Sequence, residues 1–589
     1  MLLAGILPAG CTIAPDVFSS PKPGAPPQVQ RDAGRSPDLP VTSVIMEQAR
    51  AHPEAHRVIL LEDGDDALLA RIHLIRAARE SIDVQTFIWV YDDSGLFVFR
   101  ELLAAARRGV KVRILVDQNV PPKISTEEYA ALVTAHENLE LRLFRPISRN
   151  AINTSWTFTH TALTRYSTLN RRMHNKILAV DGVAAITGGR NYQDAYFDRD
   201  PEFDYLDRDV LISGPAMAGV RESFETFWNS RKAYEASRMS DLKEALEEGR
   251  ARMPEAVRRP VGPKFAEIDR LAGRPDLAAI RPSLKSWPVA DLEFMWDSPA
   301  KFHPFGIGSD RDAFEPIIAA VRAAEEEVCF ESPYVVMGKK GYKLFRSLRK
   351  ENPGLQLRVV TNSLSSTDNV YAGAISLKQR RSLIVELGCE LYVAKPQPGE
   401  IRQMVSRYGE LLQENGRSSQ AELPTGAARI EQEQDGPVYC IHSKSIVVDR
   451  EICYVGSHNF DPRSFSLNTE CGVIIRDAAF SIHLEGIIRK KMRPQNSWVV
   501  AARDYPPVME ELNSFITAVS SQLPLFDIWP LEHSSCYELK EGFEPVPPDH
   551  PEFYERYEDV GPIPGLDIGM TTVQAELIRG FAGIATPLM

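Results

Sequence analysis

The sequence lacks several features that would place it in a common class. It has no run of about 18 apolar residues, which a membrane-spanning helix needs. It has seven cysteines in 589 residues, none of them in a CxxC pair, and no HExxH pattern. These absences argue against a transmembrane protein, a disulfide scaffold and the common types of zinc site. We therefore expect no metal and no cofactor.

The sequence also lacks an excess of positive charge. It has 68 Lys and Arg residues against 80 Asp and Glu residues, which gives a formal net charge of −12. Nonspecific binding to nucleic acid depends on neutralising phosphates with Lys and Arg, so no nucleic-acid partner is expected. The length is sufficient for two separate hydrophobic cores.

Two distant segments carry the same polar residues at the same spacing. Each has a histidine, a lysine two positions later, an aspartate five positions further on, and then a glycine and an asparagine. The residues are His174, Lys176, Asp181, Gly188 and Asn191 in the first copy, and His442, Lys444, Asp449, Gly456 and Asn459 in the second. One His-x-Lys pattern is a weak signal in a long chain, but two in one register indicate shared chemistry.

The chemistry of the motif fits an anionic substrate. The apolar runs 177–180 and 446–448 predict buried strands, on which His and Lys two positions apart project to the same face. An imidazole beside a fixed cation suits a phosphodiester, with phosphate-oxygen donors at Asn191, Asn459 and Ser457. The motif aspartates, Asp181 and Asp449, lie an odd number of positions after the histidines, so their side chains should project to the opposite face of the strand. We expect them to be structural supports beside the site rather than proton carriers.

Other parts of the chain repeat as well. Residues 67–89 are echoed by 313–336, and the predicted strand 110–117 by 355–362. The offset is about 245 residues in these pairs and 268 at the histidines. We assign the difference to a surface insertion in the polar stretch 400–436. The pattern predicts a tandem duplication of one α/β unit.

The motif segments HNKILAVDGVAAITGGRN and HSKSIVVDREICYVGSHN resemble the paired signature of the phospholipase D superfamily. Residues 87–95, 105–117, 171–176 and 361–368 are similar to bacterial cardiolipin synthases, and the last two segments point to the C-type branch. The resemblance implies an α/β pseudodimer: two tandem lobes, each a mixed sheet flanked by helices, with one shared active site between them.

The resemblance also implies roles for single residues. His174 would attack phosphorus and become a phosphohistidine, while His442 would protonate the departing alcohol and later deprotonate the incoming one. An acidic residue about thirty positions after each histidine would hold the other ring nitrogen. Asp207 and Glu470 stand at these places. Asp209 is an alternative to Asp207, which could instead be a solvated charge.

The expected reaction is phosphatidyl transfer between phospholipids at a membrane surface, with cardiolipin formed from phosphatidylglycerol. Transfer to water, which would release phosphatidic acid, is the first alternative. A phosphodiesterase that acts on nucleic acid and a scaffold with an inactive site are the others. Water exclusion at the acceptor site would decide between transfer and hydrolysis.

The expected domain organisation follows from the repeats. Residues 46–240 and 301–500 would form the two lobes, with a connector at 241–300 and an extension at 501–589. Residues 1–45 would form a hydrophobic stub and a Pro-rich tether. The opening residues, MLLAGILPAGC, resemble a bacterial lipoprotein site, so Cys11 is a candidate for lipidation, and a plain hydrophobic stub is the alternative. We expect peripheral or lipid-anchored association with the membrane, in a bacterial cell envelope.

Overall fold

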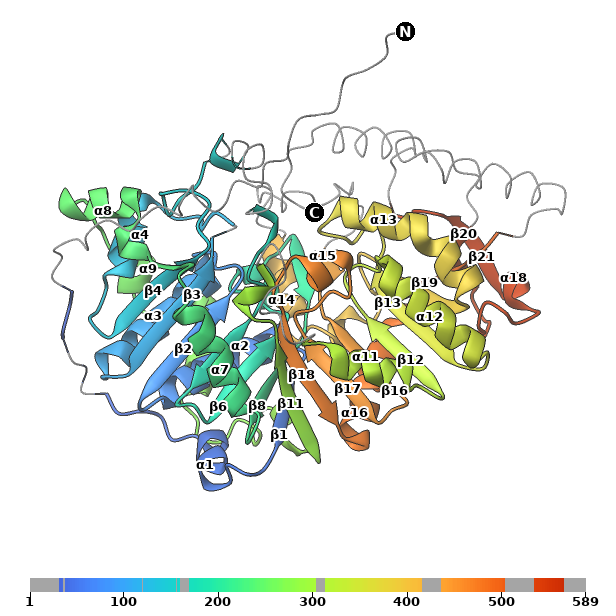
Figure 1. The fold of residues 1–589 in the computed structure, drawn as a ribbon, viewed down its shortest axis with the longest axis horizontal. Helices are drawn as coiled ribbons and strands as arrows, with labels where there is room; N and C mark the ends of the chain where they lie inside the picture. The colour runs from blue at the N-terminus through green and yellow to red at the C-terminus, as the bar shows by residue number, and fades with distance from the viewer. Residues whose placement is uncertain are drawn as a thin grey trace, which may run out of the picture.

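The computed structural model describes residues 31–34, 36, 38–118, 120–154, 156–158, 161, 169–302, 313–415, 436–503 and 534–565. Two lobes lie side by side, each built on one β-sheet flanked by helices (Figure 1). Cys11, most of the expected tether and the end of the chain lie outside the described residues. Within the described ranges, no helix has the length and apolar character needed to span a membrane.

The first lobe contains a nine-stranded sheet in the order β10-β1-β8-β6-β5-β2-β3-β4-β9. The strands are β1 Arg57–Leu61, β2 Ser81–Thr86, β3 Lys111–Asp117, β4 Leu139–Phe144, β5 Ile177–Val180, β6 Ala184–Gly188, β8 Asp209–Ser213, β9 Ala233–Glu235 and β10 Trp287–Pro288. Strands β2, β3 and β4 are parallel, and the other pairs are antiparallel. The main helices are α2 Gly64–Ala77, α3 Asp93–Arg107, α4 Thr126–Val133 and α7 Met217–Trp228.

The second lobe contains a ten-stranded sheet in the order β11-β18-β17-β16-β12-β13-β14-β19-β20-β21. The strands are β11 Asp291–Trp296, β12 Glu327–Glu331, β13 Gln356–Asn362, β14 Cys389–Ala394, β16 Ser445–Val448, β17 Ile452–Gly456, β18 Cys471–Arg476, β19 Ser497–Ala502, β20 Ser534–Leu539 and β21 Tyr557–Gly561. The main helices are α11 Glu315–Arg322, α12 Lys339–Glu351, α13 Val370–Arg381 and α16 Ala478–Lys491.

The two sheets repeat one topology. The order from β11 to β19 matches that from β1 to β9, and corresponding neighbours run in the same relative direction. The predicted echo of 110–117 at 355–362 corresponds to strands β3 and β13. The α/β class and the tandem lobes are therefore confirmed.

Two segments outside the expected lobes take part in the second sheet. Strand β11 lies in the expected connector, 241–300, and forms one edge of this sheet beside β18. Strands β20 and β21 lie in the expected extension and lengthen the opposite edge beyond β19. The second lobe therefore begins before residue 301 and continues past residue 500.

The polar stretch 400–436 is not wholly a surface insertion. Its described part contains the helix α14, Tyr408–Asn415. Ile401, Val405 and Leu411 from this part are buried against Leu206 of the first lobe. These three apolar residues anchor the segment at the lobe boundary, although the surrounding sequence is polar.

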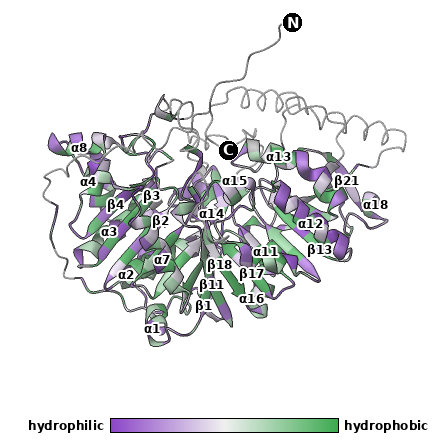
Figure 2. Ribbon diagram, in the orientation of Figure 1, coloured by the Kyte–Doolittle hydropathy of each residue, from purple (hydrophilic) through white to green (hydrophobic). Residues whose placement is uncertain are grey.

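The lobes share a hydrophobic core where their sheets face each other. Alternate residues of the strands point into it, as the two-residue period of a strand requires. They include Val58, Ile177, Ala185, Val210 and Ile212 from the first sheet, and Val447, Cys453, Val455, Val473 and Ile475 from the second. Figure 2 shows these strands as hydrophobic and the outer helices as more hydrophilic. The shared core fixes the position of one lobe against the other.

Candidate active site

Each motif histidine lies just before a strand rather than on it. His174 and Lys176 precede β5, and His442 and Lys444 precede β16. The expectation that both side chains belong to the strand itself is therefore wrong. The cause is that the backbone entering each histidine pairs across the lobe boundary instead of joining its own sheet.

This pairing occurs in both directions. Met173 forms a parallel bridge with Thr469, and the His174 N–H donates to the Thr469 carbonyl at 2.8 Å. In the second motif, β15 (Val438–Ile441) pairs in parallel with β7 (Phe203–Leu206). The His442 N–H donates to the Leu206 carbonyl at 2.8 Å. Each histidine is thus placed beside the acidic residue that follows its partner segment.

The orienting acids are exchanged between the lobes. The Nδ1 atom of His174 lies 2.7 Å from Glu470 Oε2, and that of His442 lies 2.5 Å from Asp207 Oδ2. Both acidic side chains are fully buried, so Asp207 is not a solvated charge. The alternative, Asp209, instead forms ion pairs with arginines of its own lobe. Since each Nδ1 is directed at a carboxylate, each Nε2 remains available for chemistry.

The motif glycines explain how the acids come so close. Gly188 ends β6, and Gly456 ends β17. A Cβ at either position would lie 2.5 Å from a backbone carbonyl of the adjacent strand segment, that of Arg208 or Cys471. These two carbonyls belong to the residues that directly follow Asp207 and Glu470. Only glycine leaves room for this approach.

The two lysines are buried beside the histidines. Lys176 Nζ donates to the His174 carbonyl at 2.9 Å, and Lys444 Nζ lies 2.8 Å from His442 Nδ1. Burial, together with the charge of Lys444, lowers the pKa of Lys176 to about 8, although Glu470 opposes this shift. Charges from both motifs therefore act on one another, which indicates a single electrostatic site.

The histidines are neutral in the unliganded site. Burial is the main cause that lowers the pKa of His174 to about 4, and the neighbouring lysines add to it. Burial and Lys444 also lower the pKa of His442. Burial opposes ionisation of Glu470, but the hydrogen bond with the His174 ring and the charge of nearby Lys176 outweigh burial, and the pKa of Glu470 falls to about 2. A neutral imidazole beside an ionised carboxylate is the state that a nucleophilic histidine needs.

The expected phosphate donors are placed differently from one another. The Ser457 hydroxyl donates to Glu470 Oε2 at 2.6 Å, so its only proton supports the acid rather than a phosphate. Asn191 is buried, and its Oδ1 accepts from the Ile88 N–H at 3.1 Å. Asn459 is half-buried, and its Oδ1 has no hydrogen-bond partner among the described residues. The expectation for Ser457 is corrected, and the two amides remain candidates.

The motif aspartates lie at the far ends of β5 and β16 from the histidines. Asp181 accepts from the backbone N–H groups of residues 79, 80 and 81, and Asp449 from those of residues 325, 326 and 327. Each aspartate therefore fixes the start of the neighbouring strand, β2 or β12. These contacts favour a structural role for both aspartates, at a distance from the histidines instead of beside the site.

Several residues at the site have no counterpart in the repeat and were missed. The His442 ring contacts Tyr196 and Tyr205, with ring centroids 5.2 and 5.0 Å apart. The His174 ring contacts Phe87 at 5.0 Å. A search for repeated residues could not find them, because the two lobes differ at these positions.

A buried network of four charges lies directly behind the second motif. Arg208 forms ion pairs with Glu62 and Glu331, each at 2.6 Å. Lys491 forms ion pairs with the same two acids at 2.9 and 2.6 Å. The Ser443 hydroxyl, next to His442, also donates to Glu331 at 2.6 Å. The network joins the lobes, because Arg208 and Glu62 belong to the first lobe and the other members to the second.

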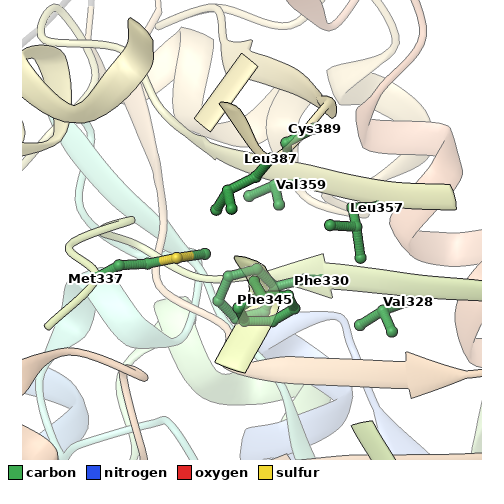
Figure 3. Close-up of a pocket in the computed structure, with 8 residues that line it drawn as sticks. All are labelled: Val328, Phe330, Met337, Phe345, Leu357, Val359, Leu387 and Cys389. Carbon is green, nitrogen blue, oxygen red and sulfur yellow. The ribbon is translucent and has the colours of Figure 1, made fainter. Parts of the chain in front are cut away.

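A separate pocket lies inside the second lobe (Figure 3). It is lined by Val328, Phe330, Met337, Phe345, Leu357, Val359, Leu387 and Cys389. These side chains are apolar apart from one thiol, and burial raises the pKa of Cys389 well above its ordinary value, so the thiol stays protonated. The pocket therefore offers no group for phosphoryl transfer.

Comparison with known proteins gives one consistent family. The family described as "Cardiolipin synthase, PLD-like domain" matches residues 71–228 and 317–492. An uncharacterized protein of Helicobacter pylori is 31% identical over 463 residues, 78% of this chain and 83% of that protein. Cardiolipin synthase C of Escherichia coli is 30% identical over 439 residues, 74% of this chain and 84% of that protein. The crystal structure of a Haemophilus influenzae phosphatidylserine synthase covers 82% of this chain and 99% of its own, with 12% identity and a TM-score of 0.48.

Proposed function

This chain belongs to the cardiolipin synthase family with phospholipase D-like domains, and we propose that its shared site transfers a phosphatidyl group between phospholipids through a phosphohistidine. It is a phosphatidyltransferase of the phospholipase D type, and cardiolipin from phosphatidylglycerol is the product that the family favours. The observation that supports the mechanism best is the exchange of acids: His174 with Glu470, and His442 with Asp207.

In the first step, His174 Nε2 attacks the phosphorus of the donor lipid. His174 Nδ1 keeps its proton and donates it in a hydrogen bond to Glu470, which keeps the ring oriented and stabilises the positive charge that develops on the ring. The bond between phosphorus and the headgroup oxygen breaks, and His442 donates a proton to that oxygen. The phosphatidyl group is then held on His174 by a P–N bond.

The lysines bind the phosphoryl oxygens. Lys176 and Lys444 supply two buried cations beside the histidines, and burial strengthens their attraction for an anion. A bound phosphodiester brings a negative charge into the site and therefore raises the pKa of His442 above its unliganded value. Substrate binding thus helps His442 to carry the proton that the departing alkoxide requires.

In the second step, the hydroxyl of an acceptor lipid gives its proton to His442 and attacks phosphorus. The P–N bond breaks, and His174 returns to its neutral form. Water can take the place of the acceptor, which would yield phosphatidic acid. The outcome depends on how well the site holds an alcohol and excludes water.

The substrates place the protein at a membrane surface. We propose peripheral attachment, with lipidation of Cys11 as a second contact with the bilayer. Exchange of Cys11→Ser should release the protein from isolated membranes if lipidation contributes to attachment. Unchanged membrane association and an unchanged mass of the N-terminal peptide would remove this part of the proposal.

The function is tested with purified protein and phosphatidylglycerol vesicles, with lipid products identified by mass spectrometry. Cardiolipin is the expected product, and His174→Ala and His442→Ala should each abolish its formation. His52→Ala is the matched control, because its side chain is 57% exposed on the surface. Phosphatidic acid as the only product would replace transfer by hydrolysis, and no turnover of any lipid would refute both.

A trapping experiment tests the division of roles. His442→Ala, given a phosphodiester with an activated leaving group that needs no protonation, should accumulate a phosphorylated histidine at residue 174. His174→Ala should accumulate none. An adduct on His442 in the second variant would reverse the assignment of nucleophile and acid.

A further inference from the structure

A carboxylate that the mechanism does not use lies on the His442 side of the site. Asp368, between β13 and α13, accepts hydrogen bonds from the hydroxyl groups of Tyr334 and Tyr205, the latter at 3.4 Å. Tyr334 follows β12 in the second lobe, whereas Tyr205 lies on β7 of the first. Burial raises the pKa of both tyrosines well above the ordinary value, so they remain protonated donors. The carboxylate is therefore held in place from both lobes.

This cluster is next to the proton-transferring group. The Tyr205 ring lies 5.0 Å from the His442 ring, in direct contact with it. Burial lowers the pKa of both His442 and Lys444, and the negative charge of Asp368 partly offsets this lowering. Asp368 itself is only partly buried. A carboxylate has about four acceptor positions, so two tyrosine donors leave capacity for further hydrogen bonds.

The fold does not require this arrangement, because the first lobe lacks it. Strands β3 and β13 correspond, and the residue six positions past the end of β3 is Lys123, where the second lobe has Asp368. The position that corresponds to Tyr334 is occupied by Ile88. On that side the His174 ring contacts Phe87, which offers no hydrogen bond. Phe87 thus presents an apolar ring to the nucleophile, whereas the tyrosine hydroxyl groups and the carboxylate of Asp368 lie on the side of the acid.

The difference matches the two sides of the reaction. His174 meets phosphorus, whereas His442 meets the oxygen of the alcohol that leaves or enters. We propose that Asp368, oriented by Tyr334 and Tyr205, is a subsite for a second hydroxyl group of a polyol headgroup. The inference rests on the proposed function and specifies which alcohol the site accepts.

In this arrangement, one hydroxyl of the polyol lies at His442 and a neighbouring hydroxyl donates to Asp368. The first oxygen attacks phosphorus, the P–N bond to His174 breaks, and the proton moves to His442 Nε2. Asp368 accepts a hydrogen bond throughout and takes no proton. Water has no second hydroxyl on a carbon skeleton, so it gains nothing from the subsite. Asp368 would therefore favour transfer to a polyol over hydrolysis.

The test compares glycerol with 1-propanol as acceptors for a phosphatidyl group, using the full-length protein and phospholipid vesicles. Both acceptors have three carbons, but 1-propanol has one hydroxyl. The wild type should prefer glycerol, and Asp368→Asn should lose roughly 10- to 100-fold of that preference, the range expected for a hydrogen bond to a charged group. Any indirect change at His442 should affect transfer to glycerol and transfer to 1-propanol equally. The ratio of the two products therefore reports only the recognition of the second hydroxyl group.

Glu386→Gln is the matched control, since Glu386 pairs with Tyr342 on the outer surface of the same lobe. Tyr334→Phe keeps the carboxylate but removes one of its donors, and it should lower the glycerol preference by a smaller factor. This variant also decides the matter if Asp368→Asn does not fold, as judged by its thermal unfolding. An unchanged ratio in the variants, or an equal fall for both alcohols, would overturn the proposal. Failure of the wild type to form either product would instead refute the proposed function.

Discussion

Glu470 holds His174 from the opposite lobe, with its Oε2 atom 2.7 Å from Nδ1 of the ring. In the same way, Asp207 of the first lobe contacts Nδ1 of His442 in the second lobe. Neither lobe therefore contains a complete pair of histidine and orienting acid. The duplication has produced one site that exists only while the two sheets are packed against each other.

Loss of either exchanged acid should reduce turnover strongly while the fold persists. Glu470→Gln and Asp207→Asn keep the size of the side chain but remove the charge that orients the imidazole and stabilises its cationic form. By analogy with other orienting acids, we expect a loss of roughly 10²- to 10⁴-fold in turnover, measured by lipid product formation. Glu293→Gln, an exposed position, is the control. Activity within threefold of wild type in either variant would contradict the orienting role.

The rate of phosphohistidine formation should decline only at an unusually low pH on the acid side of its pH profile. In His442→Ala with an activated phosphodiester, only neutral His174 can attack, and its pKa is lowered to about 4. The burst of leaving group should therefore rise through about pH 4 and stay level at neutral pH. It should fall through about pH 8 as Lys176 loses its proton.

Stopped-flow measurement across this range separates the two limbs. Lys176→Arg should remove the alkaline limb, because a guanidinium stays charged far above pH 8. An acid limb with its midpoint near 6.5, the ordinary value for histidine, would show that His174 is not depressed by burial.

The charge network behind the second motif should contribute to stability in a way that salt does not screen. Arg208→Gln leaves the buried Glu331 and the partly exposed Glu62 with Lys491 as their remaining cation, and breaking a buried pair costs about 3–5 kcal/mol. The thermal midpoint should fall by a similar amount at low and at high ionic strength. Arg476→Gln, which breaks an exposed pair with Asp291, should change stability by less than about 1 kcal/mol. Equal effects of the two variants would contradict the role of the buried network.

The sequence was sufficient for the architecture because both halves carry the same signals. Apolar runs at 177–180 and 446–448, each followed by a turn, are strands in the structure. The resemblance to the phospholipase D superfamily also pointed to the acids Asp207 and Glu470. It could not assign each acid to its histidine, since that depends on how the lobes pack in space.

Other features of the site were beyond the reach of the repeat. Ser457 lies within the second motif segment, yet its proton is donated to Glu470, a contact that the spacing of the motif does not predict. Tyr205 and Asp368 break the symmetry between the lobes, so comparison of the two halves passes over them. A search for residues that are repeated in both lobes cannot detect residues that occur in only one lobe.

The motif aspartates give the last prediction, because they repeat together with the histidines and lysines but contact the backbone of a neighbouring strand instead of the site. Asp181 and Asp449 have φ angles of 52° and 49°, a left-handed conformation that asparagine also adopts. Asp449→Asn therefore removes the charge without straining the backbone. The substitution weakens the three hydrogen bonds that backbone N–H groups donate to the side chain, each at 2.8 Å, and should lower the free energy of unfolding by about 1–3 kcal/mol.

Turnover of Asp449→Asn, measured at a temperature well below its unfolding midpoint, should stay within about threefold of wild type. Lys444→Gln should behave in the opposite way, with little change in the midpoint and a loss of roughly 10²-fold or more in turnover, since it removes a cation from the phosphoryl group. A large loss of turnover in a fully folded Asp449→Asn would show that the aspartate acts on the site after all. The contrast between the two variants therefore separates the residues that build the motif from those that perform its chemistry.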